Sequence, residues 1–224
     1  MDGNATARRK QAKTAAEGPA PVADRLGRRE LNKLAKRTRI LEAAREMFGE
    51  QGFSATTIQE IAARAGVAAG TVFLYAKSKE DLLIQAFSGG LEGVVEEARR
   101  SLPQSAPVLE RLLHIYDAVI DYHASLGPGL SAILLRELMY GPEDRRSNAG
   151  MMELERLFDE VIADGQARRE LRARLDIAET DDTLFSVFYW QLVHWTLGRM
   201  SAEALRARVR ERLAVCLTGM ARRG

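Results

Sequence analysis

The chain has 224 residues and a net charge of +2, with 46% hydrophobic and 29% charged residues. This length allows one or two domains with an ample core, and the composition is that of an ordinary soluble protein rich in helix formers. The single cysteine, Cys216, excludes an intramolecular disulfide and a cysteine-rich zinc site. The N-terminus has no hydrophobic segment typical of a secretory signal, and no apolar run approaches the length of a membrane span. We therefore expect a cytoplasmic protein.

Charge is distributed unevenly along the chain. Residues 1–80 carry 15 Lys and Arg against 9 Asp and Glu, a net +6, whereas residues 81–224 carry 18 against 22, a net −4. A basic end on a mildly acidic body is expected of a protein that meets phosphate at one end only. A solvated charged face is the simpler alternative, but it does not need this asymmetry.

Residues 1–30 are rich in Ala, Gly, Pro and charge, and they hold too few large aliphatic side chains to order themselves. We predict a disordered basic tail there, with an arm that follows DNA as the alternative. The first ordered helix is expected from about Leu31 to Glu50, because apolar residues recur there at helical spacing. Gly52 is expected to end it.

The segment from Thr56 to Lys79 reads TTIQEIAARAGVAAGTVFLYAKSK and is the most informative part of the chain. Thr56 or Thr57 can cap a first short helix, since each is followed three residues later by the Gln or Glu of a capping box. Gly66 supplies the positive φ that a sharp turn needs. A second helix, roughly residues 68–76, begins with three small residues and exposes almost no charge. We interpret residues 57–76 as a helix-turn-helix.

Beyond this motif the pattern stays helical, without strand alternation. Gly89, Gly90 and Gly93 interrupt the next helix, and each costs about 1 kcal/mol relative to Ala in a helix interior. They form either a soft joint or a site of close packing, and the sequence leaves both readings open. Helices are expected at about residues 79–100, 107–125, 129–140, 148–170, 177–198 and 202–220.

The last two of these helices carry apolar stripes. Residues 184–197 are apolar nearly all round, which indicates burial on more than one side. We expect both helices to form an association surface, and an intramolecular core is the alternative. The two stripes consist of Leu184, Phe188, Gln191, Leu192 and Trp195, and of Leu205, Val209, Leu213, Cys216 and Met220.

Several correlated motifs surround the helix-turn-helix at fixed spacing. Upstream lie Arg39-Ile-Leu-Glu-Ala-Ala-Arg-Glu-Met-Phe48 and then Gly52-Phe53, and downstream lies Tyr75-Ala-Lys-Ser-Lys-Glu80. With Ile-Ala-x-x-Ala-Gly-Val and Gly-Thr-aliphatic-aromatic between them, this region resembles the DNA-binding domain of the TetR/AcrR family of bacterial one-component transcription regulators. The resemblance implies an all-α protein. An N-terminal three-helix helix-turn-helix domain (34–94) would be joined to a C-terminal helical ligand-binding and dimerisation domain (95–224).

The resemblance implies a ligand-responsive repressor. Its partners would be double-stranded operator DNA with an inverted repeat, a small hydrophobic effector that releases the DNA, and a second copy bound through helices 177–198 and 202–220. No cofactor, metal or membrane is implied. A DNA-binding protein without effector is the first alternative, and a small helical enzyme is the second.

The enzyme alternative depends on three side chains. His114, Asp117 and Asp121 lie at helical spacing and could hold a metal or act as acid and base. No zinc-type motif, nucleophile elbow or phosphate loop accompanies them. We therefore expect a protein that is not an enzyme.

Carried over position by position, the family pattern implies a set of residues that face DNA. Thr57, Tyr75 and Lys79 are expected to contact phosphates, and Gln59 can read adenine. Phe73 departs from the pattern, since a tyrosine is usual there, and Ala76 stands where a phenylalanine is usual. The set is Thr57, Gln59, Ala69, Gly70, Thr71, Phe73, Tyr75 and Lys79.

The middle helices should enclose a pocket for the effector. Because an aromatic or Met side chain at helical spacing usually belongs to a core, we expect fewer than half of the candidates to contact a ligand. The main candidates are His114, Tyr116, Asp117, Tyr122, Met139, Met152, Trp190 and His194, followed by His123, Tyr140, Met151 and Phe158.

Overall fold

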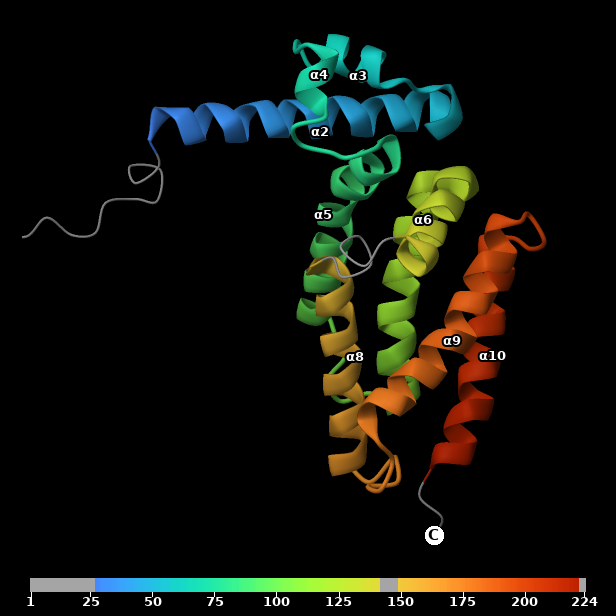
Figure 1. The fold of residues 1–224 in the computed structure, drawn as a ribbon. Coiled ribbons are helices and arrows are strands. Elements are labelled where there is room, and N and C mark those ends of the chain that lie inside the picture. The colour runs from blue at the N-terminus through green and yellow to red at the C-terminus, as the bar shows by residue number, and fades with distance from the viewer. Residues whose placement is uncertain (1–26, 142–148, 222–224) are drawn as a thin grey trace, which may run out of the picture. The chain divides into compact units, whose positions relative to one another are not determined.

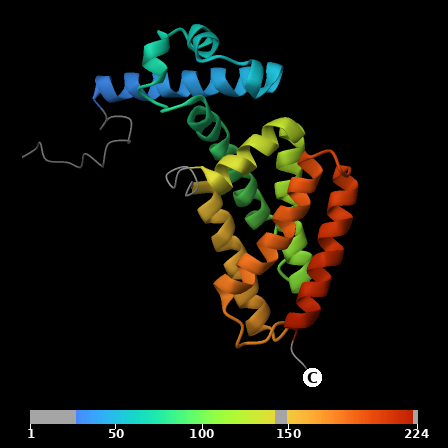
Figure 2. The same ribbon diagram turned by 45° about the vertical axis from the view of Figure 1, so that its right-hand side comes forward.

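The computed structural model describes residues 27–141 and 149–221. Within these ranges the fold is all-α, with one isolated β-bridge between Leu171 and Ala221 (Figures 1 and 2). The chain divides into two compact units, one up to Thr38 and one from Arg39 onward. Of the first unit, residues 28–38 are helical and exposed throughout. Residues 1–26 of the predicted tail lie outside the described residues.

The described helices follow the predicted order with three differences. The first helix, predicted at about 31–50, spans residues 28–55 and so begins inside the predicted tail, and it is interrupted at Gly52, whose φ is +81°. The predicted helix at 68–76 is shorter, because α4 ends at Val72 and the chain continues in turns to Tyr75. The two helices predicted at 107–140 are one element, interrupted at Gly127, whose φ is +78°. The helices are α2 (Arg28–Ala55), α3 (Ile58–Arg64), α4 (Ala69–Val72), α5 (Lys79–Arg100), α6 (Val108–Tyr140), α8 (Ala149–Ala167), α9 (Ile177–Thr196) and α10 (Ala202–Met220).

Two apolar clusters form the core of the second unit. The headpiece cluster joins buried residues of α2, α3, α4 and the start of α5 to Leu130 and Leu134 of α6. The body cluster begins in α5 at Leu91 and continues through α6, α8, α9 and α10. The change from one cluster to the other falls in α5 between Phe87 and Leu91. The headpiece cluster therefore includes two residues from beyond the predicted domain boundary at 94.

Helix α6 has the length and composition of a membrane span, with a mean hydropathy of 1.2 over an 18-residue window. In this fold its apolar side chains are used in both clusters. Ile115, Tyr116 and Ile120 are buried in the body cluster, and Leu130 and Leu134, beyond Gly127, are buried in the headpiece cluster. A core helix that serves two clusters needs apolar residues on several faces, and this requirement accounts for its hydropathy.

The apolar stripes predicted on the last two helices lie inside the body cluster. Leu184 and Leu213 are fully buried, and Phe188 is 2% exposed. These faces therefore pack within the chain. They form the intramolecular core that was the alternative to the predicted association surface. The exposed apolar side chains on and beside these helices are Trp190, Leu197 and Val215.

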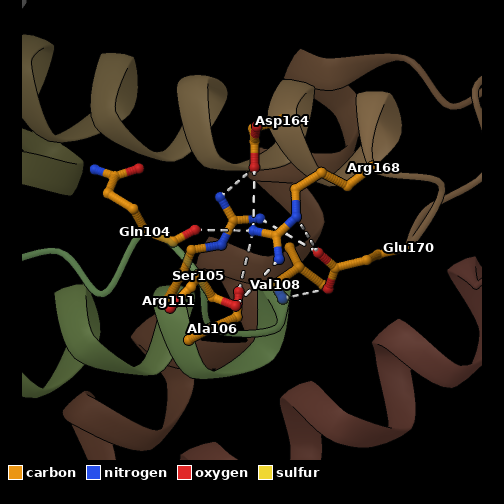
Figure 3. Close-up of polar contacts among 8 residues, drawn as sticks. All are labelled: Gln104, Ser105, Ala106, Val108, Arg111, Asp164, Arg168 and Glu170. Atoms are coloured by element: carbon orange, nitrogen blue, oxygen red, sulfur yellow. Dashed lines mark hydrogen bonds and ion pairs between the residues drawn. The ribbon is translucent and has the colours of Figure 1, made fainter.

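A buried arginine links two turns of the body (Figure 3). The Arg111 side chain is 2% exposed; its Nη1 donates to Asp164 Oδ2 at 2.5 Å, and its Nη2 lies 3.6 Å from Glu170 Oε1. Glu170 also accepts the backbone N–H of Val108 at 2.6 Å, and Arg168 donates to carbonyls of residues 104–106. The cluster holds the segment before α6 against the end of α8.

Candidate DNA-binding surface and ligand cavity

Helix α3 begins at a complete capping box. Thr57 Oγ1 accepts the N–H of Glu60 at 3.3 Å, and Glu60 Oε2 accepts the N–H of Thr57 at 2.9 Å. The hydrogen bond from the Thr57 hydroxyl and the one from its backbone lower the pKa of Glu60. Thr56 is buried, and its hydroxyl donates to the carbonyl of Gly52 at 2.8 Å. The sequence allowed either threonine as cap, and the structure selects Thr57.

The turn between α3 and α4 has the geometry that the sequence predicts. Gly66 has a φ of +65°, and the N–H of Val67 donates to the carbonyl of Ala62 at 3.0 Å. Arg64 forms ion pairs with Glu46 and Glu50, at 3.1 and 3.0 Å, and these fix α3 against α2. The helix-turn-helix is thus held by short-range backbone geometry and by polar contacts to the preceding helix.

The side chains predicted to face DNA lie on or beside this motif. Thr57, Gln59, Gly70 and Phe73 are exposed, and the other four residues of the set are partly exposed. Position 70 is open, since an added Cβ there would meet nothing within 4 Å. The sequence interpretation missed Leu74, which is 80% exposed beside Phe73. A large aliphatic residue between two aromatics in a segment with almost no charge was the available signal.

Lys79 is engaged in the fold itself. Its ammonium donates to the carbonyls of Phe53 and Thr56, both at 2.9 Å, and lies 4.3 Å from the centroid of the Phe53 ring. A cation at the last carbonyls of a helix is favourable, so Lys79 stabilises the end of α2. A cation in the first turn of a helix opposes the helix dipole. The contacts with the two carbonyls explain the lysine at this position of α5 without a phosphate neighbour. One of its three N–H groups takes no part in these two hydrogen bonds.

A cavity of about 330 Å³ lies between α5, α6, α8 and α9. Of the main candidates from the sequence, Tyr122 and Met139 line it, and His123 and Met151 join them from the second group. The rest of the lining is mostly aliphatic and aromatic. It consists of Ile84, Phe87, Ser88, Leu91, Val119, Leu134, Leu135, Leu138, Leu154, Glu155, Phe185, Phe188, Tyr189 and Leu192.

The remaining main candidates lie elsewhere, each with its own environment. Tyr116 is buried between Phe158 and Phe188, at ring distances of 4.5 and 4.4 Å, so it is a core residue. Met152 and Trp190 are exposed, at 60% and 56%. The ring of His194 lies 4.7 Å from that of Trp190, tilted by 56°.

The three side chains of the enzyme alternative are separated by their partners. His114 Nε2 lies 3.0 Å from the hydroxyl of Ser101. Asp117 accepts from Arg206 at 2.8 Å, and Asp121 pairs with the same arginine. The structure thus engages the two carboxylates with a cation from α10 and directs the imidazole to α5.

Tyr122 connects the cavity to the glycine-rich stretch of α5. Its hydroxyl donates to the carbonyl of Phe87 at 2.7 Å, and burial raises the pKa of this phenol to about 12. A Cβ at Gly90 would lie 2.8 Å from Cε2 of the Tyr122 ring, whereas Gly89 and Gly93 face open space. At Gly90, close packing explains the glycine. The α5 helix runs without interruption through all three positions.

An exposed helix-turn-helix joined to a helical body with an apolar cavity defines a DNA-binding regulator with its own ligand site. Residues 40–86 match the family described as bacterial regulatory proteins, tetR family. The fatty acid metabolism regulator protein of Bacillus subtilis is 28% identical over 171 residues, 74% of this chain and 86% of that protein. The HTH-type transcriptional repressor KstR2 of Rhodococcus jostii is 27% identical over 217 residues, 91% of this chain and 97% of that protein.

A solved structure agrees with these sequence matches. FadR of Thermus thermophilus, a TetR-family transcriptional repressor in complex with lauroyl-CoA, superposes with a TM-score of 0.68 at 29% identity, over 84% of this chain and 96% of that chain. These matches support a TetR-family DNA-binding transcriptional regulator, and the family's DNA-binding segment lies at residues 40–86.

Proposed function

We propose that the chain is a cytoplasmic, homodimeric repressor that leaves its operator when a small apolar molecule occupies the cavity. The cavity volume lies at the lower end of the usual range for small-molecule sites, and its lining is mostly apolar. The lauroyl-CoA complex of the similar FadR makes a long acyl group the first effector to test. The protein acts by binding and release rather than by catalysis.

One observation carries this proposal: three residues belong to both the cavity lining and the headpiece cluster. Ile84, Phe87 and Leu134 line the cavity and are also members of the headpiece cluster. Ile40, Phe48 and Ile61 of α2 and α3 lie in that same cluster, and Val72 of α4 completes it. Because packed cores respond to displaced volume by discrete shifts rather than by soft deformation, a ligand against these three residues alters the support of the helix-turn-helix.

A second connection runs through the backbone of α5. The Tyr122 side chain lines the cavity, and its hydroxyl bonds the Phe87 carbonyl. A ligand that turns this ring acts on α5 through that hydrogen bond and through the close contact at Gly90. Gly90 then serves as a packing surface for a moving tyrosine, rather than as a break in the helix.

The magnitude of the switch can be bounded. A hundredfold loss of operator affinity requires a coupling free energy of about 2.7 kcal/mol between ligand and DNA. By reciprocity, operator DNA must weaken ligand binding by the same factor. The ligand acts only through its different affinity for the two conformers.

For the DNA surface we propose the eight predicted residues together with Leu74. Gln59 is exposed at the start of α3 and can read adenine, while Ala69, Thr71 and Leu74 offer apolar contacts to thymine methyl groups. The Thr57 hydroxyl already donates to Glu60 at 2.7 Å, so its contact with a phosphate requires that this bond opens. The other residues set position through the phosphates and by close approach of the backbone.

We propose that two copies associate through the outer faces of α9 and α10. Trp190, Leu197 and Val215 are exposed there, at 56%, 57% and 74%. Burial of these apolar side chains in an interface would be favourable, and a two-fold interface presents the same patch from both copies. Two helix-turn-helix motifs related by a two-fold axis require an operator with an inverted repeat. Light scattering of the full-length chain measures the association state directly.

The test compares a cavity-filling variant with a matched surface variant. Leu138 lines the cavity but does not belong to the headpiece cluster. Leu138→Phe therefore reduces the space for a ligand without changing a residue of that cluster. Met152→Phe places the same side chain at an exposed site beside the lining residue Met151. Operator DNA is first selected from a random library, and fluorescence anisotropy then follows its release by lauroyl-CoA.

We expect lauroyl-CoA to release operator from the parent and from Met152→Phe, and to need at least a tenfold higher concentration with Leu138→Phe. Operator affinity without ligand should be the same in all three proteins. Release that is equally sensitive in both variants would contradict the cavity as the effector site. An operator complex unchanged by lauroyl-CoA and by simple long-chain alcohols would favour the DNA-binding protein without effector.

A further inference from the structure

The polar atoms of the cavity are few, and they are nearly all hydrogen-bond acceptors toward a ligand. Among the described lining residues, Ser88, Tyr122, His123, Glu155 and Tyr189 carry polar side chains. Arg and Lys are absent from the part of the lining that the structure describes. The hydrogen-bonding state of each polar group decides which ligand chemistry the cavity accepts.

The three hydroxyl groups each lie near a backbone carbonyl, Tyr122 in a short hydrogen bond and the other two in long ones. Tyr122 donates to the carbonyl of Phe87 at 2.7 Å, Tyr189 to that of Leu135 at 3.4 Å, and Ser88 to that of Gln85 at 3.4 Å. A hydroxyl that has donated its proton keeps its oxygen lone pairs as acceptors. These groups therefore offer oxygen to a ligand.

Glu155 adds an acceptor that carries charge. It lines the cavity and is exposed, so it lies where the cavity meets solvent. Desolvation raises its pKa, and the negative charges of Asp159 and Asp182 raise it further. A ligand carboxylate placed near this group meets like charge without a cation among the described lining residues.

His123 is the one imidazole among the described lining side chains, and it can present an N–H or an acceptor nitrogen, according to its tautomer. The residue is 5% exposed, and its Nδ1 is buried without a hydrogen-bond partner. Burial lowers its pKa to about 4, so the imidazole is neutral at pH 7 and carries one N–H and one acceptor nitrogen. A buried polar group without a partner costs free energy, and a ligand that bonds it recovers that cost.

We infer that the cavity prefers an apolar ligand bearing an uncharged hydrogen-bond donor, such as a hydroxyl, over an ester or thioester of the same length, and that it excludes carboxylates. This inference rests on the proposed function, because it takes the cavity to be the effector site. A hydroxyl can donate to Glu155 or to one of the three hydroxyl oxygens, and it can accept from His123. An ester accepts only, and a carboxylate accepts and is repelled.

The experiment uses three ten-carbon probes that differ only at the polar end: decanol, methyl decanoate and decanoate. Calorimetry or competition at pH 7.5 measures their affinities for the full-length chain. We expect decanol to bind at least tenfold more tightly than methyl decanoate and at least a hundredfold more tightly than decanoate. Glu155→Gln keeps the shape and removes the charge, so decanoate should gain at least tenfold. Glu96→Gln, on the exposed side of α5, is the matched control and should change nothing.

The outcomes separate this inference from the proposed function. Decanoate or methyl decanoate binding as tightly as decanol would overturn the inference, and so would a Glu155→Gln variant with unaltered decanoate affinity. Lauroyl-CoA releasing operator while decanol fails to bind would also overturn it and leave the repressor function intact. Failure of every probe and of lauroyl-CoA to bind would refute the ligand-responsive function itself.

Discussion

The residues proposed to contact DNA all lie between positions 57 and 79, whereas the cavity draws its lining from positions between 84 and 192 on four helices. In the first region a cap, a glycine turn and two short helices place most of the side chains through local geometry, and Lys79 is the exception. In the second, no two adjacent helices suffice, and each side chain is placed by packing against distant ones. A surface made locally tolerates exposed apolar residues, but a cavity made at long range depends on an intact core.

The same substitution should have opposite consequences in the two regions, and this is the largest effect expected. Leu184 is fully buried in the body cluster, and Leu74 is 80% exposed. Leu184→Glu places a carboxylate in the core at a cost of several kcal/mol, a large part of a typical total stability of about 5–15 kcal/mol. We expect it to abolish cooperative unfolding. Leu74→Glu should keep the parental melting temperature and lose operator binding.

Circular dichroism melts and anisotropy measure both properties. A folded Leu184→Glu protein with the parental melting temperature would break the comparison, and so would a Leu74→Glu protein that binds operator normally. The burial of Leu184 also changes what such a variant reports. A test of dimerisation needs an exposed position, because this residue belongs to the monomer core.

The next prediction concerns charge inside the body. Asp181 is 8% exposed, and its Oδ1 has no hydrogen-bond partner. Burial, followed by the charges of Asp159, Glu155 and Asp182, raises its pKa from 3.8 to about 7. The folded state therefore favours the protonated acid, so stability is complete below about pH 4 and is lost as the pH rises through 7. Asp181→Asn should stabilise the protein at pH 8 by on the order of 3 kcal/mol.

Melting temperatures at pH 8 and at about pH 4.5 check this sign. The gain from Asp181→Asn should shrink at the lower pH, and Glu211→Gln, an exposed control on α10, should show no such difference. Burial lowers the pKa of His123 to about 4, so this residue reduces stability as the pH falls below 6.5. The reduction is the same in the parent and in the variant, so it does not change the difference between them. An equal gain at both pH values would contradict the raised pKa.

The smallest expected effect concerns Lys79, in the region between positions 57 and 79. Lys79→Met removes two bonds from an ammonium to the carbonyls of Phe53 and Thr56. We expect a loss of about 1–2 kcal/mol in the free energy of unfolding, since these bonds are partly exposed. If its remaining N–H meets a phosphate, the slope of log affinity against log salt falls by about 0.9. A lower melting temperature with an unchanged slope would remove Lys79 from the DNA-binding set.

Sequence reasoning predicted the local region well, for a physical reason. Positive φ at Gly66 and the capping box at Thr57 follow from short-range sterics and hydrogen bonds, which a sequence carries directly. The contacts of Lys79 were missed because its partners lie 23 and 26 residues away, at the end of α2 and just beyond it. The exposure of Leu74 was missed because an aliphatic residue is normally expected inside.

In the body, helix positions were predictable and helix faces were not. The stripe that includes Leu184 and Phe188 has the spacing of an interface and of a core alike, and only the packing of the other helices decides between them. The same limit applies to the cavity, because Tyr116 and Tyr122 are the same residue type on the same helix, α6, but face different surroundings. The ring of Tyr116 fills the core, while that of Tyr122 faces the cavity.

The membership of Leu130 and Leu134 in the headpiece cluster sets a rule for building hybrid regulators. A graft that joins residues up to about 94 to the body of another sensor leaves these two leucines behind and opens a gap under the DNA-binding helices. The transplanted unit should instead carry the part of α6 beyond Gly127, either as native residues or as matched substitutions in the recipient. Modularity in this chain therefore follows the packing of side chains, and the cut that respects it is discontinuous in sequence.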